Sequence, residues 1–231
     1  MPPQPQLRVG AAQINCDLGN IPANLETHRR LIEQAQSRQL DLLVFPELSL
    51  TGYGLGRRAP NVALPADSET LAELAEASGS LQLVVGFVEE ASPGEYYNAL
   101  AILQDGRIQA IHRKLNLPTY GGLEEGKWFT PGNSLTQHSV APGWPAQYLI
   151  CADLWNPGLV HRAMMQRPAL LCAPINSASG IVSDDFSNER NWQINVQFYA
   201  MTYGTPVIMA NRYGEEGDSL FWGGSCILGP R

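Results

Sequence analysis

The chain has 231 residues, 44% of which are hydrophobic, and a formal net charge of −7 at pH 7. The hydrophobic fraction is enough for a sizeable core and excludes a disordered chain, while the negative charge argues against nucleic acid or an anionic membrane as a partner. The length fits a single large domain over 1–231, in which we expect residues 1–6 to form a flexible tail.

The first half of the chain predicts alternating strands and helices, followed by a run of three strands. In chain order, apolar periodicity predicts a strand over 7–14, a helix over 20–40, a strand over 41–45, a helix over 67–78 and strands over 81–90, 96–104 and 106–114. Asp67 or Ser68 is suited to cap the second helix. Asp105-Gly106 is a hairpin signal between the last two strands.

The second half begins with a loop rich in glycine and proline and then alternates again. We expect a loop over about 115–133, a strand over 146–151, a helix over 159–166, a strand over 169–175, a helix over 188–204 and a strand over 205–212. Gly204 is suited to end the last helix. We interpret "GEEGDS" (214–219) as a solvated acidic loop. Together the elements predict one α/β domain with a mixed sheet and helices packed outside it.

Three polar residues stand where predicted strands end. Glu47 follows "LLVF", Lys114 follows "IQAIH" and Cys151 follows "QYLI". Each has an ordinary structural interpretation: a carboxylate that caps a loop, a solvated charge and an inert core thiol. Sites in sheets with helical crossovers, however, form beyond the carboxyl ends of strands, where these three side chains would meet.

The chemistry of the three groups is coherent. A thiolate is a strong nucleophile, and a nearby cation favours it. A carboxylate can accept the thiol proton and later activate a water molecule. An ammonium group can stabilise the oxyanion of a tetrahedral intermediate. Such a site suits acyl transfer from an amide or nitrile carbon through a thioester.

The sequence segments around these residues resemble the motifs of the carbon–nitrogen hydrolase (nitrilase) superfamily, in its amidase-like branch. "VFPELSLTGYG" resembles the glutamate motif, "HRKLNLPTYGGLEEGKWFTPG" the lysine motif with its following loop, and "LICADLWNPG" the cysteine motif. "GAAQINCDLGNIPANLE" and "GTPVIMANRYGEEGDSLFWGGSCILGP" add support. The resemblance runs from about residue 7 to 230, with the motifs in the expected order.

The resemblance implies a four-layer αββα sandwich and assigns roles to the site. Glu47 matches the general base, Lys114 the lysine that stabilises the oxyanion, and Cys151 the nucleophile. Glu125 matches a second glutamate that orients the lysine or the substrate, and the adjacent Glu124 is the alternative.

The resemblance also implies a small-molecule substrate beside these groups. The backbone N–H of Ala152 would be a second oxyanion donor. We expect the pocket to be lined by residues next to the motifs, although aromatic side chains are more often in the core: Tyr53, Tyr120, Ala152, Trp155, Asn176 and Ser177.

The expected activity is hydrolysis of the non-peptide C–N bond of a small amide, with release of ammonia. We expect no metal and no organic cofactor, since the four histidines show no metal-ligand spacing. Within this class the substrate is open: an amide, an N-carbamoyl amine or acid, glutamine or a nitrile. The alternative from another class is a catalytically silent binding or assembly protein with the same fold.

The resemblance further implies a homodimer or higher homo-oligomer, with apolar residues of 156–166 and 198–204 at the interface. Leu159, Val160, Met164 and Phe198 would equally suit the core. The four widely spaced cysteines and an N-terminus unlike a signal peptide lead us to expect a cytoplasmic protein without a membrane span. Because family members usually continue beyond "GP", we expect a fold shortened at its C-terminus.

Overall fold

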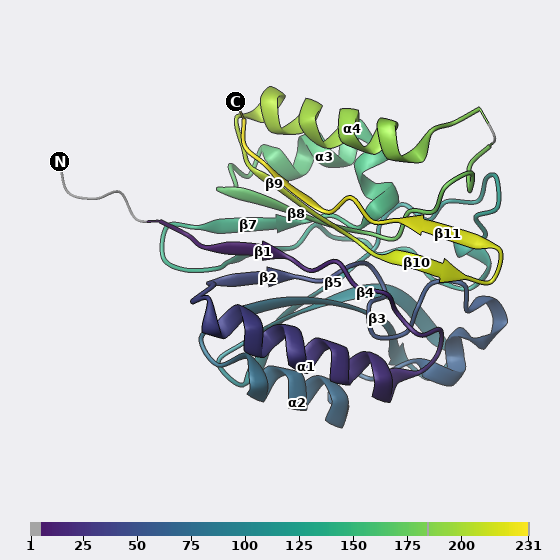
Figure 1. Cartoon of the computed structure of the whole chain (residues 1–231), viewed down its shortest axis with the longest axis horizontal. Coiled ribbons are helices and arrows are strands. Elements are labelled where there is room, and N and C mark those ends of the chain that lie inside the picture. The colour runs from purple at the N-terminus through teal and green to yellow at the C-terminus, as the bar shows by residue number, and fades with distance from the viewer. Residues whose placement is uncertain (1–5, 184, 231) are drawn as a thin grey trace.

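The computed structural model describes residues 6–183 and 185–230, so the tail expected over 1–6 lies almost wholly outside the described residues. Two β-sheets pack face to face, and helices cover the outer face of each sheet (Figure 1). The chain thus forms the four-layer αββα sandwich that the resemblance implies. Both large sheets are mixed, as periodicity predicts, but the expectation of a single sheet is wrong, because the strands divide into two five-stranded sheets and one two-stranded sheet.

The first sheet has the strand order β1-β2-β3-β4-β5. Its strands are β1 (Val9–Ala11), β2 (Leu42–Val44), β3 (Gln82–Ser92), β4 (Glu95–Gln104) and β5 (Arg107–Arg113). The pairs β1–β2 and β2–β3 are parallel, whereas β3, β4 and β5 form an antiparallel meander. The predicted turn joins β4 to β5, where Asp105 and Gly106 have φ angles of 53° and 73°. Two positive φ angles in succession are typical of a tight hairpin turn.

Helices α1 (Ile21–Ser37) and α2 (Glu69–Ser78) cover the first sheet. The side chain of Ser68 accepts a hydrogen bond from Leu71 N, so Ser68 and not Asp67 caps α2. The helices contribute Ile32, Leu71 and Leu74, among others, to a core shared with the outer face of the sheet.

The second sheet has the order β12-β9-β8-β7-β6. Its strands are β6 (Gln137–Ser139), β7 (Pro145–Tyr148), β8 (Leu170–Ile175), β9 (Val207–Asn211) and β12 (Cys226–Leu228). Helices α3 (Pro157–Met164) and α4 (Asn188–Tyr203) cover it. As predicted, Gly204 ends α4, in a left-handed conformation at φ 63°.

Apolar side chains from the facing strands fill the space between the sheets. The first sheet contributes Leu42, Val44, Val84, Leu100 and Ile102, and the second sheet and its loops contribute Tyr148, Ile150, Cys172, Ile208 and Ala210. All of these residues are buried. This layer sets how the two sheets, and the loops at their ends, lie relative to one another.

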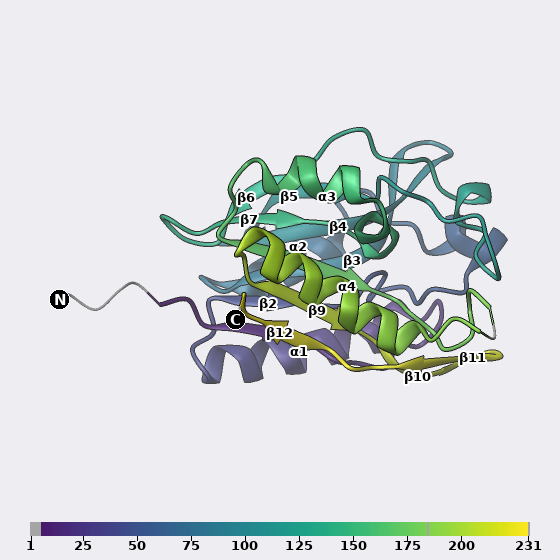
Figure 2. The same ribbon diagram turned by 90° about the horizontal axis from the view of Figure 1, so that it is seen from above.

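The segment interpreted as a solvated loop is part of a β-hairpin. Strands β10 (Tyr213–Glu216) and β11 (Ser219–Trp222) pair antiparallel and extend from one end of the sandwich (Figure 2). Glu216 forms an ion pair with the buried Arg212 and accepts hydrogen bonds from Tyr53 N and Gly54 N. The carboxylate of Glu216 therefore anchors the acidic segment to the rest of the domain.

Element boundaries differ most at the first strand. The strand expected over 7–14 pairs with β2 only over Val9–Ala11. Beyond it the chain turns toward the C-terminal hairpin, where Ile14 O accepts a hydrogen bond from Tyr213 N and Asn15 Oδ1 accepts one from Arg212. Three short 3-10 helices were also not predicted: η1 (Gly56–Val62), η2 (Glu125–Lys127) and η3 (Cys151–Trp155).

Candidate active site

Glu47 is held in a buried loop that follows β2. The loop presses closely on β3: a Cβ atom at Gly86 would lie 2.3 Å from Leu48 N and 2.6 Å from Pro46 O. Glycine at this position therefore permits the close approach of the two backbones. The loop is also tied to the second sheet, since Asn176 Nδ2 donates a hydrogen bond of 2.9 Å to Glu47 O.

Lys114 follows β5, the edge strand of the same sheet, and its side chain reaches Glu47. Its Nζ lies 2.6 Å from Glu47 Oε1 and 2.7 Å from Glu125 Oε1. The side chains of Lys114 and Glu47 are fully buried and that of Glu125 nearly so. Asn98 Nδ2 adds a hydrogen bond of 2.7 Å to Glu47 Oε1. Paired charges of this kind tolerate burial because each compensates the other.

Glu125, and not the adjacent Glu124, belongs to this buried cluster. Its Oε1 also accepts a hydrogen bond of 2.6 Å from Tyr53 OH. Glu124 is exposed and pairs with Lys127. Glu125 faces Lys114 because it is the buried residue of the 3-10 helix η2.

Burial and mutual charge set the protonation of the cluster. Burial raises the pKa of Glu47 to about 7, in the same direction as the Glu125 charge, although Lys114 and Asn98 oppose the rise. Burial alone would lower the pKa of Lys114, but the carboxylates of Glu125 and Glu47 together hold it well above its ordinary value. Lys114 is therefore a permanent cation, whereas Glu47 can gain and lose a proton near neutral pH.

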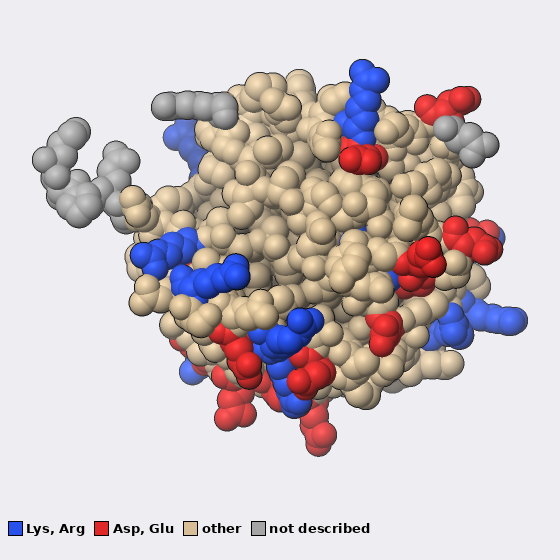
Figure 3. Space-filling model, viewed as in Figure 1, with Lys and Arg blue, Asp and Glu red and all other residues tan. Residues whose placement is uncertain are grey.

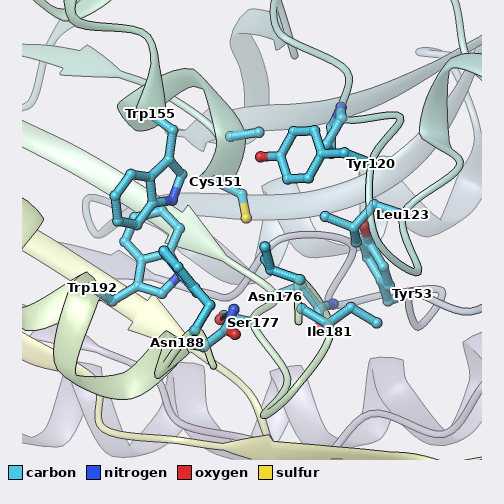
Figure 4. A pocket seen from close by; sticks show the side chains of 14 residues that line it. Tyr53, Tyr120, Leu123, Cys151, Trp155, Asn176, Ser177, Ile181, Asn188 and Trp192 are labelled. Carbon is cyan, nitrogen blue, oxygen red and sulfur yellow. Dashed lines mark hydrogen bonds between the residues drawn. The ribbon is translucent and has the colours of Figure 1, made fainter. Parts of the chain in front are cut away.

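Cys151 does not lie in a strand. Strand β7 ends at Tyr148, and Cys151 opens η3 with a φ angle of 44°. A residue other than glycine is strained in this left-handed region, and such strain gathers at functional sites. The turn directs the sulfur into a pocket (Figure 4).

The thiol of Cys151 is neutral in this environment. Burial and the charge of Glu47 raise its pKa well above the ordinary value, despite the opposing effects of Lys114 and of the backbone N–H of Asn176. The resting sulfur is therefore a thiol, and to act as a nucleophile it would need a nearby base to take its proton.

Asp153 connects the lysine loop to the cysteine turn and was not predicted. Its Oδ1 accepts hydrogen bonds from Leu115 N at 3.0 Å and Asn116 N at 2.7 Å, and its Oδ2 accepts one from Ile150 N at 2.9 Å. Asn116 Nδ2 returns a hydrogen bond of 2.7 Å to Ala152 O. The two residues that follow Lys114 and the residue that precedes Cys151 are thus held together by one buried carboxylate.

The pocket around the sulfur has a volume of about 170 Å³. All the residues expected beside the motifs line it: Tyr53, Tyr120, Ala152, Trp155, Asn176 and Ser177. The remaining lining residues were not predicted: Pro118, Leu123, Ile181, Val182, Phe186, Asn188 and Trp192. Most of these come from the loop before α4 and from its first turns, where the sequence carries no motif.

Among the described residues, the cysteines other than Cys151 do not line the pocket. Cys16 and Cys172 are buried in the core, and Cys226 is half-buried. Burial raises the pKa of Cys16 to about 12. Within residues 6–183 and 185–230, no cluster of histidine, cysteine or acidic side chains is arranged to hold a metal ion. Nor is any helix in that part of the chain long and apolar enough to span a membrane.

The family model of carbon-nitrogen hydrolases matches residues 8–231. The chain belongs to this family. Among curated carbon-nitrogen hydrolase relatives, it is 29% identical to the glutamine-dependent NAD(+) synthetase of Thermotoga maritima, over 96% of the chain and 38% of that protein. It is 26% identical to N-carbamoylputrescine amidase of Solanum tuberosum, over 96% of the chain and 78% of that protein. The chain thus spans about two fifths of the synthetase and most of the amidase.

Solved structures share the carbon-nitrogen hydrolase fold found here. The glutamine-dependent NAD+ synthetase of Acinetobacter baumannii superposes with a TM-score of 0.84 at 24% identity, covering 97% of this chain and 41% of that one. The amidase of Nesterenkonia AN1 from the nitrilase superfamily superposes with a TM-score of 0.83 at 23% identity, covering 97% and 83%. At these identities the superpositions establish the fold.

Proposed function

We propose that this domain hydrolyses the C–N bond of a small amide through a thioester on Cys151 and releases ammonia. The observation that carries the proposal is the buried Glu47–Lys114–Glu125 cluster, whose charges act on a neutral thiol that faces a pocket. A structural ion pair would not need to adjoin a strained cysteine at a cavity. Membership of the carbon-nitrogen hydrolase family supports the same chemistry.

In the acylation step the sulfur of Cys151 attacks the amide carbon while Glu47 accepts the thiol proton. The carbonyl oxygen becomes an oxyanion, which accepts hydrogen bonds from Lys114 Nζ and from the N–H of Ala152. Lys114 has three donors and uses two on carboxylates, so one remains. Ala152 is the second residue of η3, where N–H groups lack partners within the helix. Glu47 then protonates the departing nitrogen, the C–N bond breaks and ammonia leaves.

In the deacylation step water replaces ammonia. Glu47 accepts a proton from the water molecule, whose oxygen attacks the thioester carbon. The C–S bond breaks, the sulfur recovers a proton through Glu47, and the carboxylic acid leaves. Glu125 does not transfer a proton in this scheme, because its Oε1 is occupied by Lys114 and Tyr53. It holds the ammonium group in place.

The direct test is ammonia release from a panel of small amides by the wild type and by Cys151→Ala. We expect turnover to vanish in the variant with little change in melting temperature, since Cys151 is only half-buried. Cys226→Ala is the matched control, because Cys226 is also half-buried but lies on β12. Equal turnover by wild type and Cys151→Ala would exclude the thioester.

A second measurement separates catalysis from simple binding. In Glu47→Gln no base activates the water of the deacylation step, so acyl groups that form slowly on Cys151 should persist and appear in the intact mass. A binding or assembly protein with the same fold would form no such adduct with any amide and would release no ammonia.

We also propose a homodimer through the outer face of α4. Ile194, Phe198 and Met201 are more than half exposed and recur at helical spacing. Few charged side chains lie over α4 on the face shown in Figure 3. Of the residues considered for the interface in the sequence, Val160 and Met164 are buried in the core beneath α3 and are unavailable to a partner.

A further inference from the structure

The walls of the pocket above Cys151 are apolar. Trp155 packs edge-to-face against Trp192 at 5.1 Å and against Phe186 at 5.9 Å between ring centroids. Leu123 and Ile181 lie across the pocket from this aromatic group (Figure 4). The substrate atoms beyond the reacting carbon would therefore touch rings and aliphatic carbons.

Among the lining residues that the structure describes, none carries a charged side chain. The nearby charges of Glu47, Lys114 and Glu125 pair with one another, and in the proposed mechanism their remaining polar atoms serve the reacting amide group. An ammonium or carboxylate group on the acyl part of a substrate would lose its hydration in this pocket without gaining an ion pair. Burial of an unpaired charge is strongly unfavourable.

The pocket does offer hydrogen-bond acceptors for a neutral group. Asn176 and Asn188 both line it and are at least nine-tenths buried, and the Oδ1 atom of each has no partner within the described residues. Asn188 Nδ2 is held by Ser177 Oγ, which also accepts a hydrogen bond from Trp222 Nε1. These fixed amide oxygens suit the N–H₂ of an uncharged carboxamide.

The volume limits the size of the acyl group. An apolar protein cavity of about 150 Å³ holds one benzene molecule, and this pocket measures about 170 Å³. One ring or one branched aliphatic group therefore fills the space beside the sulfur.

We propose that the preferred substrates are primary amides of uncharged, apolar acids whose acyl group is about the size of one phenyl ring. This inference rests on the proposed function and narrows it. It separates this chain from relatives named for glutamine, a zwitterion, and for N-carbamoylputrescine, which carries an amine.

The test is protection of Cys151 from alkylation, which measures occupancy of the pocket without requiring turnover. The wild-type chain is treated with iodoacetamide in the presence of phenylacetamide, L-glutamine or N-carbamoylputrescine, and labelling of Cys151 is followed by peptide mass spectrometry. We expect phenylacetamide to give half-protection at a concentration at least tenfold lower than either charged amide. Equal or better protection by a charged amide, or no protection by phenylacetamide up to its solubility, would overturn the proposal.

Two variants test whether the pocket wall causes the protection by phenylacetamide. Phe186→Ala should weaken protection by phenylacetamide at least fivefold and leave protection by acetamide unchanged. Phe198→Ala, which removes the same ring from the exposed face of α4, should change neither. Equal loss for both amides in Phe186→Ala would contradict a role in selectivity.

Ammonia release measured in parallel distinguishes the two proposals. Protection by phenylacetamide without ammonia release would contradict hydrolysis and leave the selectivity of the pocket standing. Faster ammonia release from glutamine than from phenylacetamide would support hydrolysis and overturn the apolar substrate class.

Discussion

Lys114 Nζ lies 2.6 Å from Glu47 Oε1, whereas Oε2 of the same Glu47 carboxylate has no hydrogen-bond partner within the described residues. The carboxylate is therefore fixed through one oxygen and free at the other. A fixed carboxylate with a free oxygen and a pKa of about 7 is suited to exchange a proton with a thiol and then with water.

This arrangement predicts how activity depends on pH. Because attack in the proposed mechanism requires Glu47 without its proton, kcat/KM should rise with pH through about 7 and fall about tenfold per pH unit below that value. Initial rates of ammonia release between pH 5 and 9 would show it. Glu47→Gln should lower kcat by at least about a hundredfold and remove this limb. A rate that is flat from pH 5 to 9 in the wild type would contradict Glu47 as the base.

Lys114→Met should be costly in both stability and activity. The substitution keeps much of the side-chain volume but leaves two buried carboxylates without a cation, and breaking a buried ion pair costs about 3–5 kcal/mol. Chemical denaturation would measure the loss in the free energy of unfolding. Lys127→Met is the control, because Lys127 pairs with Glu124 in solvent and such pairs contribute little. A similar small loss in both variants would show that the Lys114 pairing is not important to the fold.

Asp153→Ala should impair turnover without removing any group from the chemistry. It deprives the N–H groups of Leu115, Asn116 and Ile150 of their acceptor, so the lysine loop and the cysteine turn lose their common anchor. Misplacement of reacting groups by about 1 Å can cost about a hundredfold in rate. We expect kcat to fall by about that factor with a smaller change in KM.

Two further variants check the positioning role of Asp153. Asp153→Asn keeps one acceptor oxygen and should recover part of the lost kcat. Asp218→Ala, at the exposed tip of the β10–β11 hairpin, should leave kcat unchanged. A rise in KM with an unchanged kcat in Asp153→Ala would point to substrate binding instead.

Much of this site could be predicted from the sequence, because its main residues lie in short, contiguous motifs. Glu47, Lys114 and Cys151 each stand inside a short motif at the end of an apolar run, so pattern and position agree. Asp153 also lies inside a motif, but its partners at Leu115 and Asn116 are nearly forty residues away in the chain, and no spacing rule connects them.

Neither the pairing of the strands in two sheets nor half of the residues that line the pocket could be predicted from local patterns. Strands of both sheets are short apolar runs, and nothing in 137–139 or 226–228 indicates which sheet they join. In the sequence Phe186 falls in a predicted loop and Trp192 in a predicted helix, and no motif marks either as a pocket residue. They line the pocket only because α4 begins beside the turn at Cys151.

His28 should make the fold sensitive to acid. It lies on the buried face of α1, where its ring contacts Asn24 O and Ser49 Oγ, and burial lowers its pKa to about 4. The unfolded chain takes up this proton near pH 6.5. Stability is therefore fully present above about pH 6.5 and is lost as the pH falls toward 4, by about 3 kcal/mol in total.

Denaturation curves at pH 7 and pH 4.5 would measure this contribution. His28→Gln should be less stable at pH 7, because it loses the stacking on Phe45, but should show a weaker dependence on pH. His161→Gln, at an exposed position on α3, should keep the wild-type dependence. An unchanged pH dependence in His28→Gln would assign the acid sensitivity to other groups.

The α4 face predicts the oligomeric state. Phe198→Glu places a charge in the centre of the apolar group formed with Ile194 and Met201, which should convert a dimer to a monomer of 25.2 kDa. Light scattering at tens of micromolar would measure the mass. Gln34→Glu, at an exposed position on α1 and therefore on the other sheet, should remain dimeric. A wild-type chain that is already monomeric would refute the dimer.

In the proposed mechanism, the left-handed backbone at Cys151 restricts which nucleophiles could take its place during evolution. Side chains branched at Cβ are the least compatible with a positive φ angle. Replacement of the thiol by a serine hydroxyl preserves the turn, whereas a threonine would strain it whatever its reactivity. The conformation of one residue thus confines the chemical alternatives of this site to unbranched nucleophiles.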